Sequence, residues 1–405
     1  MEESIKFIHQ TISNSELYPV TRFGPEHAQK VLQYHESFPE YKVTPLFLLN
    51  EFAKKYGIRS VVIKDESYRF GIGSFKVLGG SYAIGNYIAQ KLQKSIHDMT
   101  YAELMNDDIR KETGNITFVT ATDGNHGRGV AWTANQLKQK SVIYMPKGSS
   151  MERLHHIQKL GAEASITDMN YDDAVRYANK QAKKNGWVMV QDTAWDGYED
   201  IPGWIMEGYS TMAHESAQQM QQLHIRPTHI FLQAGVGAMA GAVAGYFADL
   251  YGDKNRPIVT IVEPNKADCI FRTVSANDGE IHCVKGFMDS IMAGLCCGEP
   301  CTIGWKVLHD HADNFVSIPD YIAGEGMRIL GNPLQNDPRI ISGESGAAGF
   351  GLLAEALRNP NLDWLRDKLK LDSDSVVLCF STEGATDLHS YEEITWDGKH
   401  PSQLY

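Results

Sequence analysis

Cysteine and basic residues are both scarce in this sequence. Six cysteines among 405 residues are too few for a secreted scaffold held together by disulfides. Lysine and arginine number 38 against 50 aspartates and glutamates, and the formal net charge of -12 leaves no surplus of positive charge for a phosphate backbone. We therefore expect no nucleic-acid partner and a small-molecule ligand instead.

Long runs of bulky apolar residues are also missing. The longest run of low charge, 231–248, consists largely of Gly and Ala and lacks the residues of a membrane span. The N-terminal residues MEESIKFIHQ are acidic and have no positively charged head before an apolar run, so they do not resemble a secretory signal. We expect a cytoplasmic protein that does not contact a membrane.

Three cysteines, Cys296, Cys297 and Cys301, lie close together in the sequence. No CxxC pair and no HxxxH stands near them, so the spacing that zinc ligands usually show is missing. We predict packed or surface thiols here and no metal. A local disulfide that involves Cys269 or Cys283 stays open.

The length and the composition indicate two domains around one cleft. Hydrophobic residues make up 42% and charged residues 22% of the 405 positions, as in ordinary globular proteins. No internal repeat and no long linker divides the chain, so we expect the domains to interleave or abut.

Short runs rich in Val and Ile alternate with segments of helical period. Strands are predicted at 116–121, 141–144, 164–167 and 187–190, with helices at 126–137, 151–160 and 171–185 between them. A second series has strands at 229–233, 258–263 and 375–380, with a Gly/Ala-rich helix after the first of them. The pattern predicts an α/β protein with two open, mostly parallel sheets, helices on both faces of each, and an active site between the domains. The stretch 266–340 has no clear pattern.

Two loops bring chemically useful residues to predicted helix starts. Ser74-Phe75-Lys76 places a lysine among small and apolar residues, and a buried lysine would have a lowered pKa and a free amine. The loop Thr122-Asp123-Gly124-Asn125-His126-Gly127 follows a strand and opens a helix, where backbone N–H groups can hold an anion.

A third loop, Gly235-Val236-Gly237-Ala238, joins a strand to the Gly/Ala-rich helix and suits a phosphate group, because glycines let backbone amides approach its oxygens. The same residues match a dinucleotide pattern, with Glu263 as a candidate ribose ligand. In a fourth region, 343–348 and 379–387, hydroxyl groups could meet a ring nitrogen.

Taken in order, these loops resemble those of the fold-type II pyridoxal-phosphate enzymes, which include the tryptophan synthase β-chain. Ser74-Phe75-Lys76 is similar to the lysine motif of that family, Gly124-Asn125-His126-Gly127 to its asparagine loop, and Gly235-Val236-Gly237-Ala238 to its phosphate loop. The resemblance implies a homodimer with pyridoxal 5'-phosphate, a large domain of residues 1–84 and 194–405, and a small domain of residues 85–193.

The resemblance also implies a role for individual residues. Lys76 would be the Schiff-base lysine, Asn125 would meet the phenolic oxygen of the cofactor, and Gly235, Val236, Gly237 and Ala238 would bind its phosphate. Ser381, or alternatively Thr382, would meet the pyridine nitrogen. Ser74, Thr122, Asp123, His126 and Asp192 are expected to face the amino-acid substrate.

Asp123 stands where the asparagine loop of the family usually has a small residue, and Asp192 follows the predicted strand 187–190. Thr-Asp-Gly-Asn-His-Gly and Gln-Asp-Thr-Ala-Trp-Asp-Gly-Tyr resemble the diaminopropionate ammonia-lyase family, which implies elimination of ammonia from an amino acid with a second amine. Lys76, Asp123 and Asp192 are then the catalytic candidates, since a carboxylate can pair with the distal ammonium.

Other interpretations stay open. A threonine or serine dehydratase would share the cofactor residues without needing both acids, and the two aspartates could instead be helix caps. A dinucleotide-binding oxidoreductase would use the glycine loop with Glu263. A non-catalytic small-molecule-binding protein would keep the fold alone.

Overall fold

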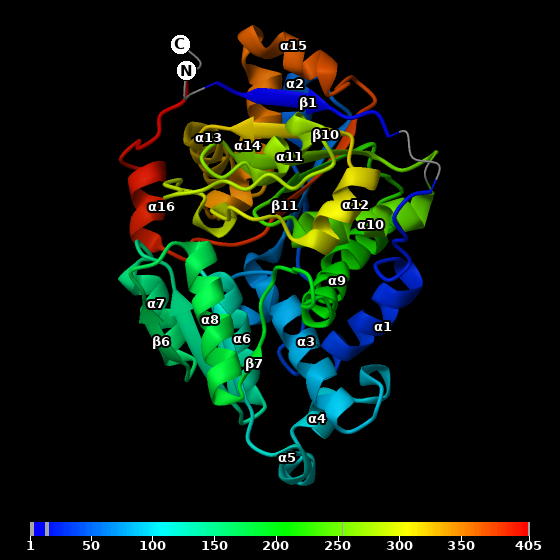
Figure 1. Ribbon diagram of the computed structural model, residues 1–405. Coiled ribbons are helices and arrows are strands. Elements are labelled where there is room, and N and C mark those ends of the chain that lie inside the picture. Colours follow the sequence, from blue (N-terminus) through cyan, green and yellow to red (C-terminus); the bar gives the residue numbers. More distant parts are fainter. Residues whose placement is uncertain (1–3, 13–15, 253, 404–405) are drawn as a thin grey trace.

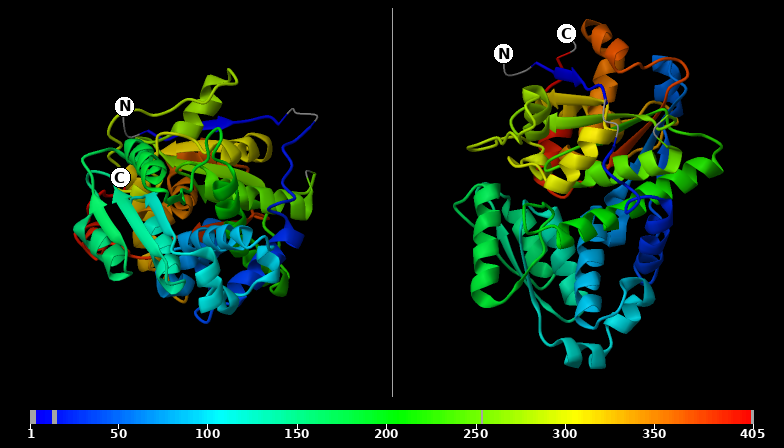
Figure 2. Two further views of the ribbon diagram at one scale, coloured as in Figure 1. Left: turned by 60° about the horizontal axis from the view of Figure 1, so that its bottom comes forward. Right: turned by 45° about the vertical axis from the view of Figure 1, so that its right-hand side comes forward.

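The chain folds around two β-sheets that lie in different lobes (Figures 1 and 2). The computed structural model describes residues 4–12, 16–252 and 254–403. One sheet has seven strands in the order β1-β10-β9-β8-β11-β3-β2, and the other has four in the order β6-β5-β4-β7. The fold predicted from the sequence, α/β with two open and mostly parallel sheets, is confirmed.

The larger sheet is parallel through its five central strands and antiparallel at both edges. Its strands are β1 (Lys6–His9), β2 (Leu46–Leu48), β3 (Ser60–Asp65), β8 (His229–Gln233), β9 (Ile258–Pro264), β10 (Asn314–Ile318) and β11 (Val376–Ser381). The smaller sheet is parallel throughout and consists of β4 (Thr117–Ala121), β5 (Lys140–Met145), β6 (Glu163–Ile166) and β7 (Val188–Met189).

The larger sheet is covered on both faces because successive residues of a strand point to opposite sides. In β3, Val61 and Ile63 belong to one hydrophobic cluster, whereas Val62 belongs to the other. Phe231 in β8 likewise joins the first cluster, and its neighbour Leu232 the second. All of these side chains are buried, which explains why the strands have continuous apolar sequences and not alternating ones.

Helices surround both sheets, and those labelled α6, α7 and α8 lie with the smaller sheet at the lower left of Figure 1. The described helices are α1 (Pro25–Glu36), α2 (Asn50–Tyr56), α3 (Lys76–Lys91), α4 (Tyr101–Leu104), α5 (Asp107–Thr113), α6 (Asn125–Gln136), α7 (Met151–Lys159), α8 (Tyr171–Asn185), α9 (Asp200–Gln222), α10 (Ala238–Tyr251), α11 (Cys269–Ala276), α12 (Thr302–His311), α13 (Asp320–Gly331), α14 (Glu344–Arg358), α15 (Asp363–Lys368) and α16 (Leu388–Thr395). In the part of the chain that the structure describes, no helix is both long and apolar enough to cross a membrane.

The stretch 266–340, which had no clear pattern, contains α11, α12, β10 and α13. The smaller sheet lies within the predicted small domain, residues 85–193, whereas α3 runs across residue 84. The domain boundaries themselves stay a prediction.

Candidate active site

A cavity lies between the two sheets. It collects the sequence-predicted residues from loops far apart in the chain. The lining residues are Ser74, Phe75, Lys76, Thr122, Asp123, Asn125, His126, Tyr171, Asp192, Gln233, Ala234, Gly235, Val236, Gly237, Ala238, Met239, Ala240, Gly294, Leu295, Cys297, Ser345, Thr382 and Glu383.

Parallel strand pairing explains why these loops meet. β4 and β7 are neighbours in the smaller sheet, so the asparagine loop after β4 and Asp192 after β7 leave the sheet at the same edge. β8 and β11 are neighbours in the larger sheet, which brings the glycine loop and Thr382 together. The backbone of Phe75 donates a hydrogen bond to the Thr382 carbonyl (3.1 Å), which fixes the lysine motif beside them.

Lys76, the first residue of α3, forms an ion pair with Asp192. Their side chains are 16% and 5% exposed. Burial acts to lower the pKa of Lys76, but the carboxylate of Asp192, together with Tyr209 and Asp123, raises it above the ordinary value. The expectation of a lowered lysine pKa is therefore wrong, because the carboxylate of Asp192 outweighs the effect of burial.

Asp192 also has neutral partners. Its Oδ1 accepts hydrogen bonds from the Tyr171 hydroxyl (3.3 Å) and the Gln191 side-chain amide (3.2 Å). Burial acts to raise the pKa of Asp192, but Lys76 and His126 lower it well below its usual range. The carboxylate is thus ionised and fixed in position.

His126 lies beside the same carboxylate, with 3.9 Å between its Nδ1 and Asp192 Oδ2. Its Nε2 donates a hydrogen bond to the Val190 carbonyl (2.8 Å), and burial lowers its pKa. A neutral imidazole in this orientation presents an Nδ1 lone pair to the site.

Asp123 faces the cavity opposite a guanidinium group. Its Oδ2 lies 3.6 Å from Arg153 Nη1 and is buried without a hydrogen-bond donor among the described residues. It does not cap α6, because the Thr122 hydroxyl accepts the N–H bonds of Gly124 (3.0 Å) and Gly127 (3.2 Å). Asp192 caps no helix either, since the next helix, α9, has Glu199 as its N-cap. The helix-cap interpretation of the two aspartates is wrong.

Asn125, the first residue of α6, points its side-chain amide at Glu383, and the two side chains are hydrogen-bonded. Both are buried, at 8% and 2% exposure. Glu383, Tyr171 and Arg153 were not among the predicted site residues, since no motif marks them.

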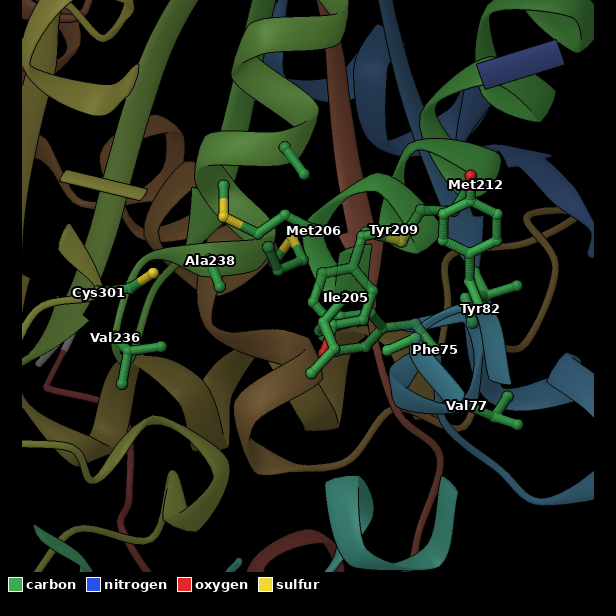
Figure 3. Packing of buried hydrophobic residues seen from close by; sticks show 14 of the residues in the cluster. Phe75, Val77, Tyr82, Ile205, Met206, Tyr209, Met212, Val236, Ala238 and Cys301 are labelled. Carbon is green, nitrogen blue, oxygen red and sulfur yellow. The ribbon is translucent and has the colours of Figure 1, made fainter. Parts of the chain in front are cut away.

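The glycine loop fits a bound phosphate. It leads into the N-terminus of α10, where backbone N–H groups and the helix dipole favour an anion. A Cβ at position 235 would lie 3.1 Å from the Cα of Leu295, and residue 237 has a φ of +89°. Figure 3 shows Val236 and Ala238 of this loop in the same hydrophobic cluster as Phe75 and Tyr209. The glycine loop is therefore held in place by buried side chains.

The two candidates for the ring nitrogen lie differently. The Ser381 hydroxyl donates to the Ser342 hydroxyl (3.0 Å), and Ser381 is not among the cavity-lining residues. Thr382 lines the cavity, and its hydroxyl oxygen accepts a hydrogen bond from Gln233 (3.0 Å). This geometry favours Thr382 as the partner of the pyridine nitrogen, although the sequence comparison favoured Ser381.

Glu263 does not face the glycine loop as a ribose ligand would. Its two carboxylate oxygens accept the backbone N–H groups of Ile270 (2.8 Å) and Phe271 (2.7 Å) at the start of α11. The oxidoreductase interpretation loses its second supporting residue.

The cysteines form no disulfide in this structure, and Cys301 instead caps α12 by accepting the Gly304 N–H (3.5 Å). Within the described residues, no group of three or more His, Cys, Asp or Glu side chains is placed to hold a metal ion.

Comparison with known proteins identifies the family. The model of the "Pyridoxal-phosphate dependent enzyme" family matches residues 38–378. The chain is 50% identical to the diaminopropionate ammonia-lyase of Escherichia coli (strain K12) over 387 residues, which cover 96% of this chain and 95% of that protein. It is also 50% identical to the diaminopropionate ammonia-lyase of Salmonella typhimurium (strain LT2) over 372 residues, 91% of this chain and 92% of that one. A crystal structure of the Escherichia coli enzyme in its holo form superposes with a TM-score of 0.91 at 47% identity and 99% coverage of both chains. The chain therefore belongs to the pyridoxal-phosphate dependent enzymes and, within them, to the diaminopropionate ammonia-lyase family.

Proposed function

We propose that this chain eliminates ammonia from 2,3-diaminopropionate and leaves pyruvate and a second ammonia as products. The observation that carries the proposal is the pair of carboxylates, Asp123 and Asp192, in the cavity that contains Lys76. A substrate with a second ammonium group gains from these charges, whereas a hydroxyl-bearing amino acid offers them no second positive charge. The relatives that are 50% identical are diaminopropionate ammonia-lyases, and the Escherichia coli enzyme was crystallised with D-serine.

The residues present fit pyridoxal 5'-phosphate. The loop of Gly235, Val236, Gly237 and Ala238 would hold its phosphate, Asn125 its phenolic oxygen, Thr382 its ring nitrogen, and Lys76 its aldehyde carbon. When bound, the cofactor supplies a conjugated ring that withdraws the electrons left on Cα after its proton is removed.

The side chains of this chain would bind the substrate and move its protons. In its neutral form Lys76 would remove the Cα proton on one face of the substrate, and Asp192 Oδ2, in direct contact with Nζ, would hold the amine in position. Ser74, Thr122 and His126 line the cavity and would orient the amino acid. Asp123 would remove the Cα proton on the opposite face of the substrate.

Comparing kcat/KM for D- and L-2,3-diaminopropionate, L-threonine and L-serine tests the proposal. A site built to pair a charged group rejects an analogue without it by about 10⁴-fold, because its own polar groups are left unpaired. We expect both isomers of diaminopropionate to be preferred on this scale. A preference for threonine would make the chain a dehydratase.

Two further properties belong to this proposal: a homodimer and a cytoplasmic location. Light scattering of the purified protein during size-exclusion chromatography, with 90 kDa expected for two chains of 45.2 kDa, tests the first. Fractionation of the source cells tests the second.

A further inference from the structure

Glu383 connects three loops of the active site. The backbone of Glu383 forms a β-bridge with Ser74 of the lysine motif. The Glu383 carbonyl accepts a hydrogen bond from the Gly343 N–H (3.0 Å), in the segment before α14. Its side chain reaches the asparagine loop through Asn125. A residue in this place controls how these loops are positioned relative to one another.

Both carboxylate oxygens of Glu383 act as acceptors. Oε1 accepts the backbone N–H of Ser345 (3.1 Å), and Oε2 accepts from Asn125 Nδ2. A carboxylate that receives an N–H on each oxygen has no donor of its own to offer. The atom of the Asn125 amide that faces Glu383 must therefore be the nitrogen.

This requirement determines what Asn125 can do with the rest of its amide. An asparagine NH₂ group has two hydrogens, and Glu383 takes one of them. The second hydrogen stays available to an acceptor in the cavity that both residues line. A flipped amide would turn its oxygen toward Glu383 and lose that bond, so the carboxylate selects one of the two orientations.

Charges of both signs surround the buried side chain of Glu383. Burial raises its pKa, with Glu344 and Asp123 acting in the same direction, whereas Arg153 and the hydrogen bond from Asn125 act against them. Arg128 also lies within its electrostatic range. Arg153 and Arg128 come from α7 and α6 on the side of the smaller sheet, and Glu383 follows β11 of the larger one.

We propose that Glu383 is a positioning residue that fixes the Asn125 amide with an N–H directed at the phenolic oxygen of pyridoxal 5'-phosphate. The inference rests on the cofactor alone and holds whichever amino acid is the substrate. The readout is therefore cofactor binding, so that its failure is separate from failure of the proposed substrate.

The test is a double-mutant cycle on the cofactor dissociation constant, measured by equilibrium dialysis of pyridoxal 5'-phosphate against apoprotein. Glu383→Gln keeps the size of the side chain but replaces one acceptor by a donor. We expect it to weaken cofactor binding by roughly 10-fold or more, the scale of one hydrogen bond to a charged group. In an Asn125→Ala background the same change should weaken binding by less than about 3-fold, since the two residues act together.

A matched control lies elsewhere in the molecule. Glu355 on α14 is buried and accepts a hydrogen bond from the Asn359 side-chain amide (2.9 Å), but it does not line the cavity. Glu355→Gln should lower the melting temperature without changing the cofactor dissociation constant. If Glu383→Gln does not fold, Glu383→Asp can replace it, since this variant retains the charge but is one methylene shorter. Its effect on the cofactor dissociation constant should depend on Asn125 in the same way.

The cycle separates a positioning role from a structural one. Dependence of the Glu383 effect on Asn125 supports the proposal. An equal loss of affinity in both backgrounds, or no loss in either, overturns it, because Glu383 would then act on the loops without acting through the amide.

Discussion

Lys76 and Asp192 form an ion pair that joins the start of α3 to the segment after β7. The pair is largely shielded from water, so each charge depends on the other. The folded-state pKa of Asp192 lies below its ordinary value and that of Lys76 lies above its own. A change in either residue therefore affects both stability and chemistry.

Asp192→Asn should destabilise the cofactor-free protein at pH 7 by about 3–5 kcal/mol, because it leaves a buried ammonium without its partner. A carboxyl whose folded pKa is lowered stabilises the fold above its unfolded pKa, and this stabilisation is lost as the pH falls toward the folded value. The difference between variant and wild type should therefore shrink below about pH 4. Urea unfolding of both proteins at pH 7 and pH 3 measures it, and an equal difference at the two pH values would contradict the prediction.

Lys76→Ala should reduce ammonia release by at least about 10⁴-fold, since the residue both anchors the cofactor and moves protons. The variant should still fold and bind some cofactor through the glycine loop and Asn125. Lys138→Ala is a suitable control, because Lys138 pairs with Asp107 at the surface (3.1 Å) and lies outside the cavity. Near-normal turnover of Lys76→Ala in an ammonia assay would refute the role of the lysine.

Gly237→Ala should weaken cofactor binding and lower stability by about 1–3 kcal/mol. Residue 237 has a φ of +89°, and an added Cβ would lie 2.9 Å from Ile270 Cδ1. Gly252→Ala introduces similar backbone strain, with a φ of +69°, but its Cβ would meet nothing within 4 Å. Only Gly237→Ala should change the cofactor dissociation constant. Equal changes of that constant in the two variants would contradict the role of the glycine loop in phosphate binding.

Much of the fold could be predicted because its central strands and crossover helices have strong periodic patterns. The strand predicted at 229–233 and the helix predicted at 171–185 have the bounds of β8 and α8. β10 lacked such a signal because two of its five buried residues are polar. Asn314 donates to Thr260 (3.2 Å) and Ser317 donates to Asp268 (2.9 Å), and these partners lie about 50 residues away in sequence.

The candidate site shows the same limit. Lys76 and Asn125 stand in motifs that depend on local sequence, so they could be identified. Tyr171 and Glu383 act through hydrogen bonds to residues 21 and 258 positions away, and no local pattern encodes such contacts. The pKa of Lys76 was mispredicted for the same reason, since its direction depends on a carboxylate 116 positions away.

We propose that Asp123 acts as a second base. D and L substrates present their Cα protons to opposite faces, and one base cannot serve both faces equally. Lys76 is paired with Asp192, whereas Asp123 Oδ2 has no hydrogen-bond donor among the described residues and lies 3.6 Å from Arg153 Nη1. A carboxylate oxygen at the cavity that accepts no hydrogen bond can take a proton from the substrate.

Asp123→Asn keeps the size of the side chain and removes the base. Activity on D-2,3-diaminopropionate should fall by roughly 10²-fold or more, the usual scale for a general base, while activity on the L isomer falls less. Steady-state kcat and KM for the two isomers measure this difference, and the loss should appear in kcat, because the asparagine can still contact the substrate. Equal losses on both isomers, mainly in KM, would instead mark Asp123 as a group that binds the β-ammonium. No loss on either isomer would mean that its only role is the ion pair with Arg153.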